Sequence, residues 1–202
     1  MESAHPPASC RLDERDMEVL HAVLEQVVVG SGACSEPGEV LVYAEAIQPE
    51  FPETVAQARN RHEVEERIAR GEEVDAEELA FEFENGFKLE PSTVEAIFAR
   101  QGCSLGDMEP PPGWFISRLE AQQHENLFAD GIVKGWKRAR RKYPGMECLV
   151  RFSAPGYMNS SETAVVSYSR VRGPLAGMGG FVVLRRFDGK WKIEWQESLW
   201  VS

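Results

Sequence analysis

Cysteine and histidine are the side chains of this sequence best suited to binding a metal or to catalysis, and both are dispersed along it. The cysteines are Cys10, Cys34, Cys103 and Cys148. The histidines are His5, His21, His62 and His124. Zinc sites are built from closely spaced ligands, and disulfide frameworks belong to small cysteine-rich chains, so we expect neither. We therefore predict no metal, no cofactor and ordinary surface or core histidines.

Serine hydroxyls and carboxylates could also do chemistry, but their arrangement indicates no reaction. The C-terminal serines lie in expected strands or turns, without a Gly-x-Ser-x-Gly elbow, and no histidine follows His124. A catalytic triad would have to be assembled from distant residues. Pairs of carboxylates carry little information in a chain that has 33 acidic residues. We predict no catalytic residue.

The glycine-rich run from Gly173 to Gly180 has the glycine density of a phosphate-binding loop. No Walker lysine follows it, and the next residues have a strand pattern rather than that of a helix. One interpretation is a wide turn or bulge between two strands. The other is a rim loop whose backbone amides receive a ligand or partner, which makes Gly177 and Gly179 candidate contacts.

Tryptophans near the C-terminus are the other candidate contacts. Trp191, Trp195 and Trp200 are first of all core or sheet-face residues. The indoles of Trp195 and Trp200 could also form the wall of a pocket. We therefore keep Trp195 and Trp200 as possible ligand or partner contacts.

Charge is distributed unevenly along the chain, whose net charge is −11. The segment 36–95 holds 17 acidic and 5 basic residues, whereas 134–202 holds 13 basic and 5 acidic ones. A basic helix from Lys134 to Lys142, with Trp136 and Tyr143, could contact nucleic acid. The isoelectric point of about 4.9 opposes that reading. We expect a solvated helix face or a partner for the acidic middle segment, and no nucleic acid.

Helical patterns occupy most of the first two thirds. Residues 1–11 carry two prolines and no periodicity, which predicts a mobile tail. Apolar residues at helical spacing predict a helix from Asp13 to Val29, and Val40 to Ile47 is an apolar run of strand length. We expect Pro52 to Gln101 to be helical and peripheral. Ser117 and Glu120 are spaced like a capping box for a further helix.

Strand patterns dominate after the basic helix. Asp188-Gly189 is a two-residue hairpin signal, and in the last strand Trp191, Ile193 and Trp195 alternate with charged residues, which predicts one buried face. We predict an α+β fold with N-terminal helices followed by a C-terminal antiparallel β-meander packed against helices. It forms a single domain over 12–202, with an acidic helical part (12–130) and a basic helix plus sheet (131–202).

No apolar run approaches the length of about 20 residues that a membrane span needs, and the first residues lack a secretory signal pattern. We predict a cytoplasmic protein that does not enter a membrane.

Several C-terminal motifs together resemble a group of uncharacterised bacterial proteins. The motifs are GWKRARRKYPG (135–145), VRFSAPGYMN (150–159), TAVVSY (163–168), GPLAGMGGFVVL (173–184), DGKWKI (188–193) and LWVS (199–202). The chain departs from the group at Ala139 and Tyr157, where the group has phenylalanine. The resemblance implies a bacterial origin and a strand-rich C-terminal third, and it implies no activity.

Two functions follow as hypotheses. The first is a non-catalytic binding or protein-interaction domain that uses its sheet face or the run from Gly173 to Gly180 as the contact surface. The alternative is a small-molecule-binding or hydrolytic enzyme, NTF2-like in shape, with a pocket between helices and sheet. The alternative predicts a cavity lined by tryptophans that contains a histidine or an acidic pair.

Overall fold

The computed structural model describes residues 10–29, 38–48, 67, 70, 81–82, 87–158 and 162–202. Its helices are α1 (Glu14–Val23), the π-helix η1 (Leu24–Val29), α3 (Pro91–Ala99), α4 (Ala121–Phe128) and α5 (Ile132–Lys142). Its strands are β1 (Glu39–Tyr43), β2 (Phe81–Glu82), β3 (Lys88–Leu89), β4 (Phe115–Leu119), β5 (Met146–Phe152), β6 (Gly156–Met158), β7 (Thr163–Gly173), β8 (Ala176–Phe187) and β9 (Lys190–Val201).

One seven-stranded sheet organises the fold and confirms the α+β class. Its strand order is β4-β1-β5-β7-β8-β9, and β6 also pairs with β7. The sheet is mixed, because β1 runs parallel to both β4 and β5 while the other pairs are antiparallel. The C-terminal strands pair antiparallel, but the predicted meander did not include β1 and β4, whose parallel pairing makes the sheet mixed. The strands β1 and β4 precede the C-terminal third and enter the sheet through long connections.

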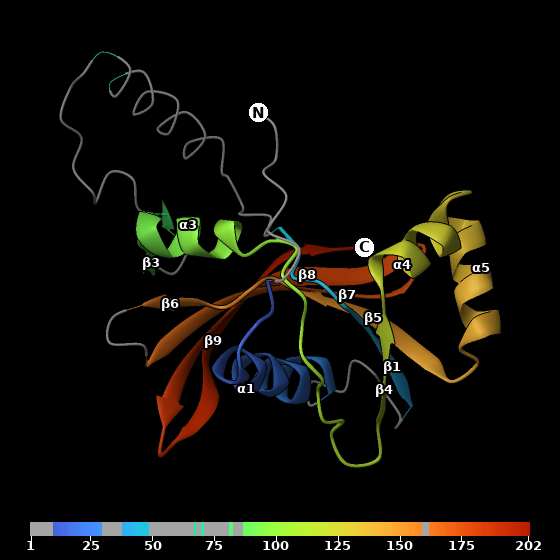
Figure 1. Cartoon of the computed structure of the whole chain (residues 1–202), viewed down its shortest axis with the longest axis horizontal. Coiled ribbons are helices and arrows are strands. Elements are labelled where there is room, and N and C mark those ends of the chain that lie inside the picture. Colours follow the sequence, from blue (N-terminus) through green and yellow to red (C-terminus); the bar gives the residue numbers. More distant parts are fainter. Residues whose placement is uncertain are drawn as a thin grey trace.

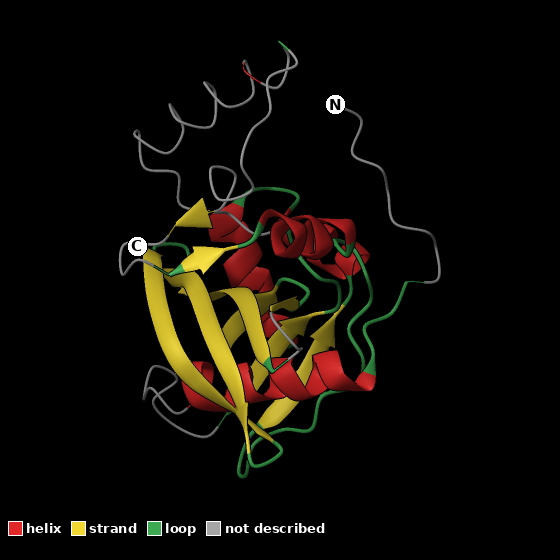
Figure 2. Cartoon of the chain, turned by 90° about the vertical axis from the view of Figure 1, so that its left-hand side faces the viewer, coloured by secondary structure: helices red, strands yellow, loops and turns green. Residues whose placement is uncertain are grey.

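Helices cover both faces of the sheet (Figures 1 and 2). On the first face, α1 and η1 pack against residues such as Val150, Val166 and Val182 to form the largest core cluster. The second face has two smaller clusters. One lies under α4 and α5 and includes Leu149, and the other includes Val165 and lies near α3 and β3. Figure 1 shows α1 on one side of the sheet and α3 and α4 on the other.

The predicted helix from Asp13 to Val29 is confirmed as α1 followed by η1. Asp13 caps α1 through a capping box with Asp16. The predicted capping box of Ser117 with Glu120 is wrong, because Ser117 lies inside β4 and the Glu120 side chain makes no cap hydrogen bond. Parallel pairing of β4 with β1 extends the backbone there, so helix α4 starts only at Ala121.

The expected helices between Pro52 and Gln101 lie mostly outside the described residues. Within the described part, α3 agrees with that expectation. The short pair of β2 with β3 was not expected. The predicted tail over 1–11 also lies outside the description, apart from Cys10 and Arg11.

The C-terminal hairpin forms as predicted. Asp188 and Gly189 connect β8 to β9 with φ values of 49° and 77°. Both angles are positive, as the two central residues of a type I′ turn require.

The single buried face predicted for β9 is wrong. The pairing with β8 shifts register between Val183 and Leu184, which leaves Glu194 as a bulged residue between Ile193 and Trp195. Ile193 therefore packs on the first face, as Trp191 does, whereas Trp195 packs on the second. An extra residue in a strand exchanges the two faces for every residue beyond it.

The expectation that no disulfide forms is also wrong, because Cys10 and Cys103 are bonded. The segment around Cys10 lies beside the loop that follows α3. Leu12 N donates to Ser104 O at 2.9 Å, and Ser104 N donates to Cys10 O at 2.9 Å. This backbone pairing brings together two cysteines that are 93 residues apart. The spacing of Cys10 and Cys103 in the sequence does not indicate that they form a disulfide.

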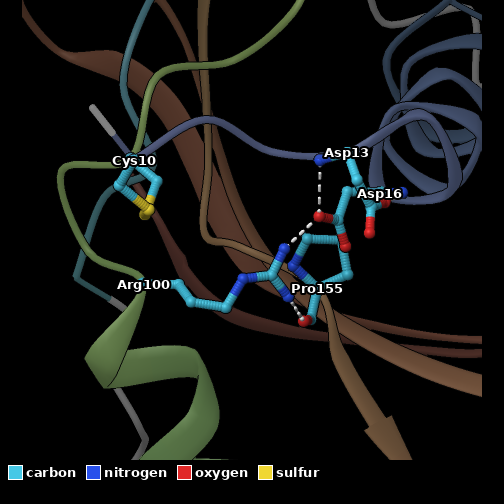
Figure 3. The surroundings of a disulfide bond; sticks show 6 residues. Cys10, Asp13, Asp16, Arg100 and Pro155 are labelled. Carbon is cyan, nitrogen blue, oxygen red and sulfur yellow. Dashed lines mark hydrogen bonds and ion pairs between the residues drawn. A yellow bond between two sulfur atoms is a disulfide. The ribbon is translucent and has the colours of Figure 1, made fainter.

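A buried ion pair lies next to this disulfide (Figure 3). The Asp16 side chain is 1% exposed and pairs with Arg100, which lies directly after α3. The other guanidinium nitrogen, Nη1 of Arg100, donates to Pro155 O at 3.0 Å. The Tyr157 hydroxyl donates to Oδ1 of Asp16 at 2.9 Å. Burial is the main cause that raises the pKa of Tyr157 above its ordinary range, and the negative charge of Asp16 is the second cause. The phenol therefore remains a donor.

Strand β9 is an edge of the sheet, and η1 contacts its outer side. Nε2 of Gln26 donates to Trp191 O at 3.2 Å, and Ile193 N donates to Oε1 of Gln26 at 3.3 Å.

Among the described helices, none is long and apolar enough to cross a membrane.

Candidate functional site

A pocket of about 550 Å³ opens on the second face of the sheet, between the helix pair α4–α5 and the end of β9. Most of its lining is apolar or aromatic. The helices contribute His124, Phe128, Ile132 and Trp136, each pair spaced four residues apart on one helix face. The strands contribute Leu149, Arg151, Ser167, Ser169, Val171, Leu199 and Trp200. A helix–sheet cavity of this kind is what the alternative hypothesis predicted.

The floor of the pocket is a row of neighbouring residues across four strands. Arg151 on β5 pairs with Ser169 on β7, Ser169 pairs with Gly179 on β8, and Gly179 pairs with Trp200 on β9. Side chains paired in this way lie on the same face of a sheet. The row therefore places a guanidinium, a hydroxyl and an indole side by side at the base of the pocket.

A chain of ring contacts forms the wall. The rings of Tyr43 and His124 lie 5.5 Å apart, those of His124 and Phe128 4.8 Å apart, and those of Phe128 and Trp136 6.0 Å apart. Gly135 allows this packing, because a Cβ at that position would lie 2.1 Å from Cδ1 of Phe128. The rings of His124, Phe128 and Trp136 line the pocket and form an aromatic wall that suits a flat or apolar ligand, whereas Tyr43 contacts His124 without lining the pocket.

The turn between α4 and α5 is fixed by Arg138. Its Nε donates to Leu127 O at 2.7 Å, and Nη1 pairs with Asp130 at 2.5 Å. Leu127 lies at the end of α4, so these bonds hold the end of one helix to the side of the next. The aromatic wall is therefore carried by two helices that are tied together.

Arg151 is the cation of the pocket. Its guanidinium lies 5.6 Å from the ring centre of Tyr43, and Nη2 contacts Nε2 of His124 at 2.5 Å. Its Nε atom is buried without a hydrogen-bond partner. No carboxylate pairs with Arg151 in the part of the chain that the structure describes. Burial lowers the pKa of Arg151 from its ordinary value, which reflects the cost of removing this charge from water.

His124 is held in its neutral form by this environment. The pKa of His124 is lowered to about 4, mainly by burial of the ring and secondly by the positive charge of Arg151. A neutral ring can accept a hydrogen bond at Nε2, and arginine can only donate. The contact of Arg151 with His124 therefore defines a ring that carries its proton on Nδ1.

Of the four residues selected from the sequence, the structure brings three together. The Trp200 indole lies over Gly177 and Gly179, where an added Cβ would come within 3.0 Å and 2.5 Å of its atoms. Trp200 also lines the pocket. Trp195 lies apart from them, stacked on Phe87 at 5.9 Å in the other cluster of the second face.

The glycine-rich run is mainly strand and not a rim loop. Strand β7 ends at Gly173 and β8 begins at Ala176, so Pro174 and Leu175 alone make the turn. The later glycines are needed because β9 and its indole approach the β8 backbone closely. Gly180 is the tightest of them, since a Cβ there would lie 2.0 Å from the carbonyl oxygen of Glu197.

Gly180→Ala is therefore expected to destabilise the protein by about 1–3 kcal/mol, the usual cost of overpacking a filled site. A backbone oxygen cannot move aside without breaking the pairing of β8 with β9. Gly177→Ala is the matched control, because its Cβ would lie no closer than 3.0 Å to the Trp200 ring and 3.3 Å to the backbone oxygen of Arg170. Urea unfolding of both variants measures the difference, and equal losses would contradict the explanation.

Arg151 and His124 were not selected from the sequence. They are 27 positions apart, on β5 and α4, and each has an unremarkable neighbourhood along the chain. The one available signal was a single arginine in an otherwise apolar strand, in the run CLVRF. Such an arginine predicts a charge that a sheet must place in a pocket or against a partner.

The chain matches no protein-family model, no curated protein and no solved structure. Within the described residues, no group of three or more histidine, cysteine, aspartate or glutamate side chains is placed to hold a metal ion.

Proposed function

We propose that this chain is a binding domain whose ligand is a small organic anion with an apolar body, held in the pocket between α4, α5 and the sheet. The observation that carries the proposal is Arg151, a half-buried guanidinium that faces no carboxylate among the described residues. A cation removed from water is costly unless it is paired. An anionic ligand would supply the pair.

The lining supports the second part of the proposal, an apolar ligand body. Phe128, Trp136, Leu149 and Trp200 line the pocket together with Arg151, and a cavity of about 550 Å³ is within the range of small-molecule sites. The Ser169 hydroxyl, beside Arg151 in the sheet, can add one hydrogen bond to the anion.

Binding is favoured over catalysis by the state of His124. A general base works best when its pKa lies near the working pH. The pKa of His124 is lowered to about 4, and its Nε2 already accepts from Arg151. Such a histidine is a poor base for activating the hydroxyl of Ser167 or Ser169.

The disulfide bears on where the protein works. Disulfides form and persist mainly in oxidising compartments and are rare in the cytosol of mesophiles. The bond between Cys10 and Cys103 thus weighs against the predicted cytoplasmic location and favours an oxidising one.

Two dyes with the same ring system test the proposal. The anion 8-anilinonaphthalene-1-sulfonate is expected to bind more tightly than neutral N-phenyl-1-naphthylamine, which lacks the sulfonate. Arg151→Met is expected to weaken the anionic dye about 10-fold or more and to change the neutral dye little, since a charge-assisted hydrogen bond contributes about 1.5–3 kcal/mol. Fluorescence titration measures both.

Arg185→Met is the matched control, because Arg185 is exposed on β8 and pairs with Glu194 outside the pocket. Circular dichroism and thermal unfolding would establish that each variant is folded. The proposal fails if the sulfonate gives no advantage, or if the Arg151 and Arg185 variants lose affinity equally.

A further inference from the structure

His124 and Arg151 form a pair in which each limits the charge of the other. An arginine has five N–H donors and no acceptor, so the contact with Nε2 of His124 requires a lone pair on that atom. Protonating His124 would put two donors and two positive charges face to face. Without a ligand, the pair therefore holds one positive charge.

The other groups around His124 do not compensate a second charge. Tyr43 on β1 presents its ring edge-on, and Phe128 on α4 contributes only a ring. The charged groups nearby are Arg151 on β5, Glu45 after β1 and Glu125 on α4. Burial is the largest cause that raises the pKa of Tyr43, and the two glutamates raise it further, so they act on Tyr43. Among the described groups, only Arg151 acts electrostatically on His124, and it opposes protonation.

An anion bound to Arg151 would reverse this balance. It would neutralise the guanidinium field, and it would offer an acceptor to a protonated His124 ring at the same place. Each bound species then favours the other, because the coupling between two ligands of one protein is reciprocal. In this case the second ligand is a proton.

We infer that the pocket binds its anion together with a proton, and that His124 changes from an acceptor for Arg151 into a second donor to the anion. The inference rests on the proposed function and adds His124 as a positioning residue. The site would thereby select a ligand whose anionic group has two or more acceptor oxygens, such as a carboxylate, sulfonate or phosphate.

The affinity is expected to rise as the pH falls. Between pH 7.5 and 5.0 the wild-type protein should bind the anilinonaphthalenesulfonate about 10-fold or more tightly, if the bound anion restores the pKa of His124 towards its ordinary value of 6.5. The sulfonate itself stays ionised throughout this range, so the change reports the protein. Neutral N-phenyl-1-naphthylamine should show no such trend.

His124→Gln is the decisive variant, because glutamine can accept from Arg151 without titrating. Its affinity should stay close to that of the wild type at pH 7.5 and should not rise at pH 5.0. His21→Gln, on α1 at the first face of the sheet, is the matched control and should keep the full pH dependence. Calorimetry at pH 6 in two buffers of different ionisation enthalpy should detect proton uptake by the wild type but not by His124→Gln.

The outcomes separate the two proposals. Arg151-dependent binding of the sulfonate with the same pH dependence in wild type and His124→Gln, or with none in either, would overturn the proton coupling and leave the proposed function standing. If the sulfonate does not bind the wild type at any pH, the proposed function itself fails.

Discussion

Replacing Arg100 by methionine is expected to lower the free energy of unfolding by about 3–5 kcal/mol, because it leaves a buried carboxylate without its cation. The Asp16 side chain is 1% exposed and that of Arg100 28% exposed, so the carboxylate is the buried member of the pair. The variant also loses the bond to Pro155 O, which links α3 to the segment before β6. Urea unfolding monitored by tryptophan fluorescence measures the loss.

A surface pair provides the comparison. Arg185 and Glu194 lie 3.2 Å apart with side chains 54% and 48% exposed, so Arg185→Met should cost at most about 1 kcal/mol. If Arg100→Met does not fold, the double variant Asp16→Asn/Arg100→Met should recover folding, because it removes both charges. Similar costs for the buried and exposed pairs would refute the assignment.

Loss of the disulfide should be the second large effect. Replacing Cys10 and Cys103 with serine is expected to lower the free energy of unfolding by about 2–4 kcal/mol. The bond joins two residues that are 93 positions apart, and without it these two residues would be free to separate in the unfolded chain. Unfolding of the wild type should therefore shift to lower urea when a reductant is added.

The Cys10→Ser/Cys103→Ser variant is its own control, because the reductant should no longer change its urea midpoint. The remaining described cysteine, Cys148, is fully buried in the core, where an alkylating reagent cannot reach it. Alkylation of Cys10 and Cys103 in the folded, unreduced protein would show that the bond is absent.

The sequence was a good guide wherever one segment determined its own structure. Apolar residues at helical spacing predicted the helix that starts at Asp13, and Asp188-Gly189 predicted the last hairpin, because both signals are local. The place of β1 in the sheet could not be read in this way. Its parallel partners begin at Phe115 and Met146, and pairing over such distances leaves no mark on the residues of one strand.

The residues of β9 show a subtler limit. Alternation placed Trp191 and Trp195 on one face, and one bulged residue, Glu194, sends them to opposite faces. A bulge depends on how two strands fit together, so the pattern of either strand alone does not contain it. The bulge places Trp195 on the same face as the pocket, but its indole stacks on Phe87 in the other cluster of that face and does not line the pocket.

Of the four residues selected from the sequence, Trp200 lines the pocket, and Gly177 and Gly179 lie beneath its indole without lining it. They were selected because large aromatics and dense glycine are visible in any sequence. Arg151 and His124 became recognisable only once β5 and α4 lay together, because their chemistry is a property of the pair. The burial of Nε of Arg151 without a hydrogen-bond partner likewise depends on the folded structure and cannot be read from the sequence.

The contact of Gln26 with β9 has a consequence for how molecules of this protein behave towards one another. A primary amide holds its N–H and C=O at the spacing of a peptide group, so Gln26 occupies the positions that a neighbouring strand would take beside Trp191 and Ile193. Free strand edges invite another chain to extend the sheet. Gln26 closes this stretch of the longest edge strand from within, and the exposed Lys192 and Glu194 beside it further discourage edge-to-edge aggregation.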